Sequence, residues 1–237
     1  MPDSLANRTL LKIRYYRAGA RWYGFALGML IDVVSKLGLR LEPYRVYLEG
    51  LGNIRAPTPP TGLDGSDLGF LGAIDMAEIA RMPGRRLSED DLRARVEAGM
   101  LCLGVKYRGS IVAFTWCNLH RCTFEKHPLF SLETHEASLF DAYTVESFRG
   151  RDLAPWMRFR CYEEMARLGR DRCYSITVVF NAPAVRFKQK LGAQALELGV
   201  FVEILRRWRF HTRLKRYTST SPVPAHGATP RSLPPRS

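Results

Sequence analysis

The sequence predicts an α/β protein in which a mixed β-sheet carries helices on its faces. Runs rich in Val, Ile, Phe and Trp alternate with segments whose apolar residues recur at helical spacing. Residues 139–180 read as strand, helix and strand, an order that requires a parallel strand pair joined by a right-handed crossover. The 237 residues, 46% of them hydrophobic, are enough for one core with extensions.

Residues 1–51 are predicted to form an amphipathic helical extension. Between residues 8 and 38, basic and apolar side chains are mixed and no proline interrupts them. The apolar run 22–31 is shorter than the roughly 20 residues that a membrane-spanning helix needs. Two interpretations stay open: the helix packs on the core, which we favour, or it lies on an anionic membrane surface.

A linker, a domain and a tail follow this extension. Residues 52–68 contain three Pro and three Gly, a composition that favours an extended connection. Residues 69–217 are predicted to form the main domain, and residues 218–237 to form a disordered tail that lacks the apolar groups to fold. Within the domain we predict strands at 70–74, 100–107, 110–119, 139–145, 173–180 and 195–205, and helices at 88–98, 153–168 and 183–191.

Short sequence signals set the boundaries of these elements. Ser88 followed by three acidic residues is typical of a helix N-cap and an acidic first turn. Gly99 and Gly169 are predicted to end helices. The pair Arg108-Gly109 between two strand-like runs predicts a tight hairpin, because glycine tolerates the positive φ of such a turn.

Charge narrows the class of partner. The chain has 36 Lys and Arg against 23 Asp and Glu, a net charge of +13, which favours an anionic partner. Nucleic acid, an anionic membrane and a phosphate-rich ligand all satisfy that balance. The stretch from Arg206 to Ser237 alone holds eight Lys and Arg and no acidic residue.

Cysteine usage points to a reduced compartment. The five cysteines have no regular spacing and follow no cleavable apolar leader, so we predict free thiols and a cytoplasmic location. The location becomes peripheral to the inner membrane face if the first helix docks there. Cys117, His120, Cys122 and His127 fit no common paired ligand spacing, so no metal site is predicted.

The most informative segment runs from Phe148 to Pro155. It follows a strand-like run and opens an apolar helix. A turn at such a junction directs several main-chain N–H groups and the positive end of a helix to one point, which suits a diphosphate. It lacks the Gly-Lys-Ser/Thr of a nucleotide-hydrolysing loop.

This segment, with Asn181–Ala184 and Lys190–Ala193 downstream, resembles the acyl-CoA motif of the GNAT superfamily of N-acetyltransferases. The resemblance covers residues 70–205 in element order and is strong over 139–193. It implies that the turn wraps the CoA diphosphate, that the preceding strand parts from its parallel neighbour, and that a free amide near Val145 polarises the thioester carbonyl. The implied cofactor residues are Tyr143, Thr144, Val145, Arg149, Gly150, Arg151, Asp152, Leu153, Ala154, Asn181, Ala184 and Lys188.

Two positions depart from the family pattern. Asp152 stands where the family usually has its first motif glycine, and we expect its carboxylate to turn outward as an N-cap of the helix that follows. Lys188 stands where the family often has a tyrosine that acts as general acid. That role is then absent, or falls to Lys188, Tyr143 or water.

The general base is predicted from acidic residues near the third strand. Asp141 is favoured because it lies within the strand and next to the thioester position, and Glu136 is second. The alternative is that these carboxylates only balance a basic protein.

The sequence thus predicts an acyl-CoA-dependent N-acyltransferase, with acetyl-CoA as co-substrate and a small-molecule amine as acceptor. A looser resemblance to acetyltransferases of bacterial surface-polysaccharide synthesis suggests an amino sugar or a lipid-linked sugar. The alternative is a non-catalytic protein that binds a membrane surface or, less in keeping with the motif, binds nucleic acid through Trp208, Phe210 and Tyr217.

Overall fold

The computed structural model describes residues 38–52, 56–124, 127–205 and 207–217, which divide into two compact units. The described part of the first unit is 38–47, 176–205 and 207–217; that of the second is 48–52, 56–124 and 127–175. The boundary passes through two strands, β1 (Leu39–Glu49) and β8 (Arg172–Val178). Of the predicted domain over 69–217, residues 176–205 and 207–217 group with the N-terminal strand.

The second unit is built on strands in the order β2-β3-β4-β7, with the first half of β8 beside β7. Its strands are β2 (Asp67–Leu71), β3 (Leu101–Tyr107), β4 (Ser110–Asn118) and β7 (Glu136–Thr144). Neighbouring strands are antiparallel except β7 and β8, which are parallel. The predicted mixed sheet with its parallel pair is thus confirmed.

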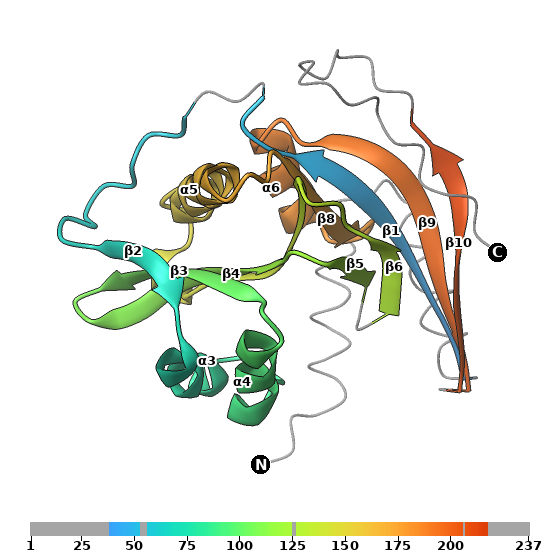
Figure 1. Cartoon of the computed structure of the whole chain (residues 1–237), viewed down its shortest axis with the longest axis horizontal. Helices are drawn as coiled ribbons and strands as arrows, with labels where there is room; N and C mark the ends of the chain where they lie inside the picture. The colour runs from blue at the N-terminus through green and yellow to red at the C-terminus, as the bar shows by residue number, and fades with distance from the viewer. Residues whose placement is uncertain (1–37, 53–55, 125–126, 206, 218–237) are drawn as a thin grey trace. The chain divides into compact units, whose positions relative to one another are not determined.

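Helices cover both faces of this sheet (Figure 1). On one face lie η1 (Ala73–Asp75), α3 (Met76–Arg81) and α4 (Glu89–Glu97), and on the other lies α5 (Leu153–Arg167). Phe114 and Trp116 of β4 belong to the core cluster that α3 and α4 cover, whereas Ala113 and Cys117 belong to clusters that α5 covers. Because β4 is buried on both faces, its sequence is an apolar run without alternation.

Several local signals are confirmed. The Ser88 hydroxyl accepts a hydrogen bond from the Asp91 amide at 3.1 Å, and the Asp91 carboxylate accepts one from the Ser88 amide, which forms a capping box on α4. Arg108 and Gly109 have φ angles of 50° and 82°, as the tight turn between β3 and β4 requires. Between β4 and β7 the structure adds a small hairpin that the sequence did not predict, β5 (Arg121–Phe124) with β6 (His127–Ser131).

A buried polar cluster holds the middle of α5. Tyr162 and Ser175 each donate a hydrogen bond to the carboxylate of Glu49, and Arg158 Nε lies 3.7 Å from Glu49 Oε2. All four side chains are buried. Since a buried carboxylate is stable only when it is paired and hydrogen-bonded, these contacts fix α5 to the last residues of β1 and to β8.

The cysteines are structural. All five are free and buried, and Cys117 Sγ lies 3.4 Å from Cys161 Sγ in the core beneath α5. Burial raises the pKa of the Cys122 thiol to about 12, so this side chain stays protonated near neutral pH. Within the described ranges, no group of three or more His, Cys, Asp and Glu is arranged to hold a metal ion.

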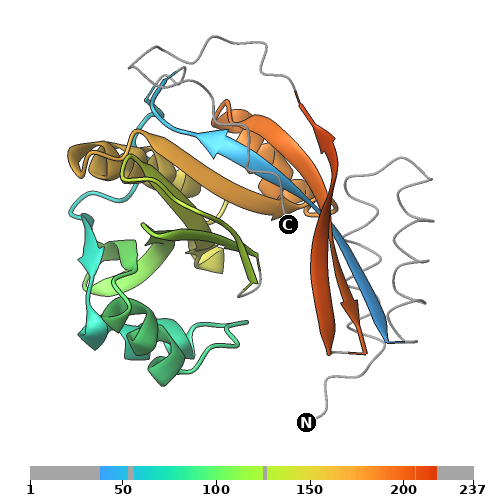
Figure 2. The same cartoon turned by 45° about the vertical axis from the view of Figure 1, so that its right-hand side comes forward.

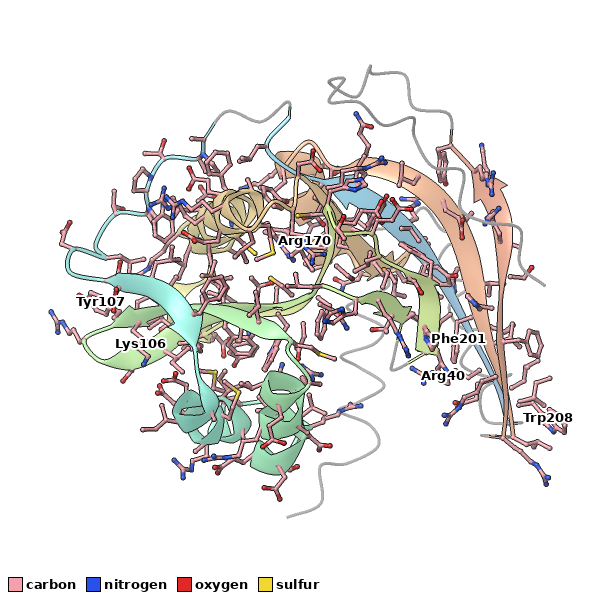
Figure 3. All side chains as sticks on the ribbon, viewed as in Figure 1. Arg40, Lys106, Tyr107, Arg170, Phe201 and Trp208 are labelled. Atoms are coloured by element: carbon pink, nitrogen blue, oxygen red, sulfur yellow. The ribbon has the colours of Figure 1, made fainter. Side chains whose placement is uncertain are left out.

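The first unit contains a long antiparallel hairpin of β9 (Gln194–Ile204) and β10 (Trp208–Arg216), with β1 beside β9 and with helix α6 (Ala182–Lys190). Both cartoon views show β1 running along this hairpin (Figures 1 and 2). Trp208, labelled in Figure 3, lies at the turn between β9 and β10 with 63% of its surface exposed. Strand β10 was not predicted.

The prediction of a helical extension over residues 1–51 is wrong for residues 39–49, which form β1. Its segment Leu39-Arg40-Leu41-Glu42 alternates apolar and charged residues, which is a strand pattern. Residues 8–37 of the predicted amphipathic helix and the predicted tail 218–237 lie outside the described residues. Among the helices that the structure describes, none has the length and apolar character to cross a membrane.

Candidate functional site

The predicted diphosphate turn connects β7 to α5. After Thr144 the chain forms the short helix η2 (Glu146–Phe148), and Arg149 is extended. Gly150 then has a φ of 75° and Asp152 a φ of 54°. A Cβ built on Gly150 would meet no atom within 4 Å, so the space in front of this glycine is open.

Main-chain N–H groups at this turn lack internal acceptors. None of the main-chain or side-chain hydrogen bonds within the described residues uses the N–H of Gly150, Arg151, Leu153 or Ala154. The first helical bond of α5 runs from Trp156 N to Asp152 O at 3.1 Å. Pro155, the third residue of α5, has no N–H, so the helix itself offers two. These amides and the positive end of a 15-residue helix suit an anionic ligand.

Two arginines add positive charge beside the turn. Arg149 Nε donates to the main-chain oxygen of Thr144 at 3.0 Å, and its guanidinium lies 5.9 Å from the centre of the Tyr143 ring. The Arg151 guanidinium lies 5.6 Å from the centre of the Phe148 ring. Both arginines are exposed, so their charges are available to a ligand in solution.

Asp152 does not have the capping role that the sequence predicted, but its conformation explains how it can stand at a glycine position of the motif. It occupies the N-cap position of α5, but its side chain accepts no hydrogen bond from the helix, so the predicted capping role is wrong. The residue adopts the left-handed conformation instead. Aspartate tolerates this conformation better than most residues, which explains how it can stand where the related motif has glycine.

Strand β7 separates from β8 early. Their parallel ladder joins Glu136, Ala137 and Ser138 to residues 172–174 and then stops. From residue 139 onward β7 is paired through β4 alone. The resemblance implied such a parting of the strands, because it leaves main-chain groups of the strand open on one side.

A free strand amide was expected near Val145. Val145 N donates to Val112 O at 2.9 Å, so the Val145 N–H is not available to a thioester. Adjacent residues of a strand direct their main-chain groups to opposite sides, so Thr144 directs its N–H away from β4. On that side Thr144 has no ladder partner among the described residues. Of the predicted strand residues Thr144 and Val145, Thr144 is therefore the one with an open amide.

Asp141 is held by two arginines. It has a φ of 47° and lies in a β-bulge, where β7 has one more residue than β4 between the pairs Phe114–Tyr143 and Trp116–Phe140. Arg85 Nη1 and Nη2 donate to its two carboxylate oxygens at 2.7 and 2.8 Å, and Arg95 Nη1 donates to Oδ2 at 2.7 Å.

These contacts make Asp141 a weak proton acceptor. Burial raises the pKa of its carboxyl group, but the hydrogen bonds and charges of Arg85 and Arg95 outweigh that effect, so the pKa lies below its ordinary value. A base that removes an amine proton near neutral pH needs a higher pKa. The geometry thus argues against the predicted role of Asp141 as general base.

Glu136 is buried and bonded at the far end of β7. Its Oε1 accepts from the Tyr174 hydroxyl at 2.8 Å, and its Oε2 accepts from the Glu133 amide at 3.1 Å. Eight residues separate it from Thr144, which is about 25 Å at roughly 3.3 Å per residue of strand. Such a distance rules out direct proton transfer at Thr144.

The remaining predicted residues belong to the first unit. Asn181 caps α6, because its Oδ1 accepts a hydrogen bond from the Ala184 amide at 3.1 Å. Lys188 is buried, with its ammonium 5.4 Å from the centre of the Phe187 ring. Their proposed contacts with a ligand stay predictions. Trp208 and Phe210 are exposed on β10, and the alternative of nucleic-acid binding stays a prediction as well.

Sequence reasoning missed Arg85 and Arg95. Arg85 follows α3 in the loop before α4, and Arg95 lies on α4, so more than 40 residues separate each from Asp141. Each is one arginine among the 36 Lys and Arg of the chain. No local pattern marks them, since the contact depends on the pairing of β4 with β7.

Comparison with known proteins gives the fold. No family model matches the chain, and no curated protein matches its sequence. Among solved structures, a GCN5-related N-acetyltransferase from Kribbella flavida matches with a TM-score of 0.51 and 13% identity, over 74% of this chain and 63% of that one. A tandem GNAT protein from the clavulanic acid biosynthesis pathway matches with a TM-score of 0.51 and 12% identity, over 77% and 57%.

A Drosophila protein matches with a TM-score of 0.53 and 15% identity, over 86% of this chain and 68% of that one. The chain thus spans less than two thirds of the length of the Kribbella and tandem GNAT structures. Identities this low support the fold alone. The parted parallel strands, the helix that follows them and these neighbours together show that the chain has the fold of the GNAT acetyltransferases.

Proposed function

We propose that this protein is an acyl-CoA-dependent N-acyltransferase that transfers an acetyl group to a primary amine. The observation that carries the proposal is the set of open main-chain amides of Gly150, Arg151, Leu153 and Ala154, with open space in front of Gly150 and an exposed arginine on either side of that glycine. A diphosphate fits this arrangement, since amides and a helix N-terminus bind phosphate without a dedicated side chain. We propose CoA as the diphosphate ester, in keeping with the fold.

The strand next to the turn supplies a position for the thioester. If the diphosphate lies at Gly150, the pantetheine arm extends along the open side of β7, and the Thr144 amide lies where it can donate to the thioester carbonyl. The carbonyl of Thr144, which belongs to the following peptide group, already accepts a hydrogen bond from Arg149 Nε.

The reaction needs little from side chains. The amine nitrogen attacks the thioester carbonyl carbon, a C–N bond forms, the C–S bond breaks, the nitrogen loses a proton and the sulfur gains one. A thioester is already activated, so positioning and polarisation supply most of the acceleration. Because Asp141 and Glu136 are held by protein hydrogen bonds, we propose that water takes the amine proton.

A pair of glycine variants tests the proposal. Gly150 and Gly169 lie at opposite ends of α5, have φ angles of 75° and 74°, and have no atom within 4 Å of the position that a Cβ would occupy. Gly150→Phe and Gly169→Phe therefore impose similar backbone strain. We expect CoA or acetyl-CoA to raise the melting temperature of the wild type and of Gly169→Phe, and to leave that of Gly150→Phe unchanged.

Two outcomes would contradict the proposal. One is a wild-type melting temperature that no acyl-CoA changes. The other is an equal CoA response in both glycine variants, which would place the ligand elsewhere. Release of free thiol from acetyl-CoA across a panel of amines then tests catalysis. We expect time-dependent release that requires both the amine and an intact Gly150 turn.

The acceptor in this proposal is a small-molecule amine, and an amino sugar or a lipid-linked sugar is the first class to test. The neighbouring structures do not bear on that choice, because identities of 12–15% carry no information on substrate. The proposal of an anionic membrane contact through the N-terminal segment can be tested separately, by co-sedimentation with anionic liposomes.

A further inference from the structure

We propose that Arg85 and Arg95, held beside β7 by Asp141, bind a carboxylate or phosphate group of the amine acceptor. The inference rests on the proposed acyltransferase function and names its substrate class: an amine that also carries an oxyanion. The observation behind it is an uncompensated positive charge in a half-buried position near the proposed thioester site.

The first step is position. Asp141 lies three residues before Thr144 on β7, which is about 10 Å at roughly 3.3 Å per residue. The loop that carries Arg85 is joined to the same strand a second time, because the Tyr143 hydroxyl donates to Pro83 O at 3.1 Å. A small acceptor anchored at the arginines can therefore place its amine near the Thr144 peptide.

The second step is charge. Two guanidinium groups share the single carboxylate of Asp141, which leaves a formal charge of +1 in this cluster. Neither guanidinium group makes another hydrogen bond or ion pair within the described chain. The Nε atom of Arg85 is buried and has no acceptor among the described residues, and the Arg85 side chain is only 10% exposed. Unmatched buried charge costs free energy, so a ligand that supplies an oxyanion would be stabilised here.

The third step is orientation. The Arg95 guanidinium lies 5.1 Å from the centre of the Trp116 ring and 5.2 Å from that of Phe140, and its Nη1 is held by Asp141. Its plane is therefore fixed against the aromatic rings, and 21% of the side chain is exposed. The remaining N–H groups of a fixed guanidinium match the two oxygens of a carboxylate or phosphate.

Arg95 is not needed to hold the loop. Arg85 already bonds both oxygens of Asp141, and Tyr143 bonds Pro83. Helix α4 is fixed by its own core residues, with Leu92 fully buried and Val96 packed against the same cluster. A second half-buried arginine at this carboxylate is better explained by a ligand than by stability.

Matched acceptors test the inference. Thiol release from acetyl-CoA is compared between glucosamine 6-phosphate and glucosamine, and between lysine and 1,5-diaminopentane, so that phosphate and carboxylate are tested separately. We expect the wild type to favour at least one anionic member by about tenfold or more in kcat/KM. In Arg95→Met, which keeps an unbranched side chain at this position and removes the charge, we expect that preference to fall about tenfold. Arg95→Lys is expected to show an intermediate preference, because it keeps the positive charge but loses the paired N–H donors of the guanidinium group.

Arg93→Met is the matched control. Arg93 lies on the same helix and is paired with Glu89 at the surface, so this variant removes the same charge away from the cluster. We expect it to keep the wild-type preference. A preference that survives in Arg95→Met, or a wild type that favours the neutral member of both pairs, would overturn the inference.

A binding measurement separates this inference from the proposed function. In protein saturated with CoA, millimolar inorganic phosphate is expected to raise the melting temperature of the wild type and of Arg93→Met, and to have no such effect on Arg95→Met. If CoA stabilises the protein but neither phosphate nor anionic acceptors discriminate Arg95→Met, only the acceptor class is overturned. If CoA itself has no effect, the proposed function fails first and this inference fails with it.

Discussion

The two ends of helix α5 contain similar glycines but differ in how their main-chain groups are bonded. At the C-terminal end, Gly169 N donates to Ala166 O and Arg170 N donates to Met165 O, which closes the helix by a Schellman arrangement. At the N-terminal end, the amides of Gly150 and Arg151 have no acceptor within the described ranges. A positive φ thus accompanies a closed set of hydrogen bonds at one end and open main-chain amides at the other.

The arginine side chains at the two ends of α5 also differ in whether the protein itself bonds their donors. Arg170, labelled in Figure 3, directs Nη1 to three main-chain oxygens, those of Leu119, Glu133 and Glu136. Arg149 and Arg151 at the other end are exposed. An arginine whose donors are used by the protein stabilises structure, whereas one that faces solvent near open amides is available for a ligand.

The largest expected loss of stability comes from the polar cluster that holds the middle of α5, because both ends of the helix are positioned by it. Glu49→Ala removes the carboxylate that Tyr162 and Ser175 bond and that Arg158 faces, so a buried positive charge loses its partner. We expect a loss of about 3–5 kcal/mol in the free energy of unfolding, measured by urea titration. Glu49→Gln keeps the shape and should cost less. Equal stability of Glu49→Ala and the wild type would show that this cluster does not anchor α5.

The next largest loss of stability is expected from a substitution at the C-terminal end of α5. Arg170→Met keeps the apolar stem and removes three hydrogen bonds from a charged donor. We expect about 2 kcal/mol less stability. The gain in melting temperature from CoA should stay as in the wild type, because the diphosphate turn is unchanged. A variant that loses the CoA response while keeping its stability would mean that the ends do not act separately.

A smaller, pH-dependent loss of stability is expected from a substitution on β7, the strand that precedes the N-terminal end of α5. The pKa of Asp141 is lowered in the folded protein, so its contribution is complete well above the unfolded value of 3.8 and is lost as the pH falls below it. Asp141→Asn should therefore be about 1–2 kcal/mol less stable than the wild type at pH 7. Urea unfolding at decreasing pH should show this difference shrinking below about pH 4. A difference that is constant with pH would mean that ionisation of Asp141 is not its source.

The smallest expected change in stability comes from a substitution at the N-terminal end of α5. Asp152→Gly relieves the backbone strain of a non-glycine residue in the left-handed conformation. It also removes a negative charge beside the proposed diphosphate position. We expect about 0.5–1 kcal/mol more stability and a Kd for CoA that is lower by about threefold. Calorimetric titration with CoA measures the affinity. Weaker binding by Asp152→Gly would show that the carboxylate helps the ligand instead of repelling it.

Much of the second unit could be predicted because its signals are local. Helix α5 was expected at 153–168 and is found at Leu153–Arg167, and the hairpin at Arg108-Gly109 follows from the φ angles that glycine allows. The turn from Gly150 to Ala154 could be proposed as a diphosphate site because its residues are consecutive. Each of these features is decided by neighbours in the sequence, so one sequence is enough to indicate it.

Features that depend on distant residues were missed. The bulge at Asp141 arises from the register between β4 and β7, and this register decides which side chain reaches Arg85 and Arg95. The prediction of Asp141 as a base used its position in the strand alone, without the bulge and the two arginines. The free amide could be expected only near Val145 for a related reason: the partner strand is needed to show which peptide groups are already bonded.

The open amides also provide a natural reporter. An N–H without an internal acceptor exchanges its hydrogen for solvent deuterium nearly as fast as in an unfolded chain, whereas those inside α5 must wait for the helix to open. A bound diphosphate would slow exchange at Gly150 and Arg151 and leave Gly169 as it was. Deuterium uptake at single residues would thus reveal occupancy before any chemistry is known.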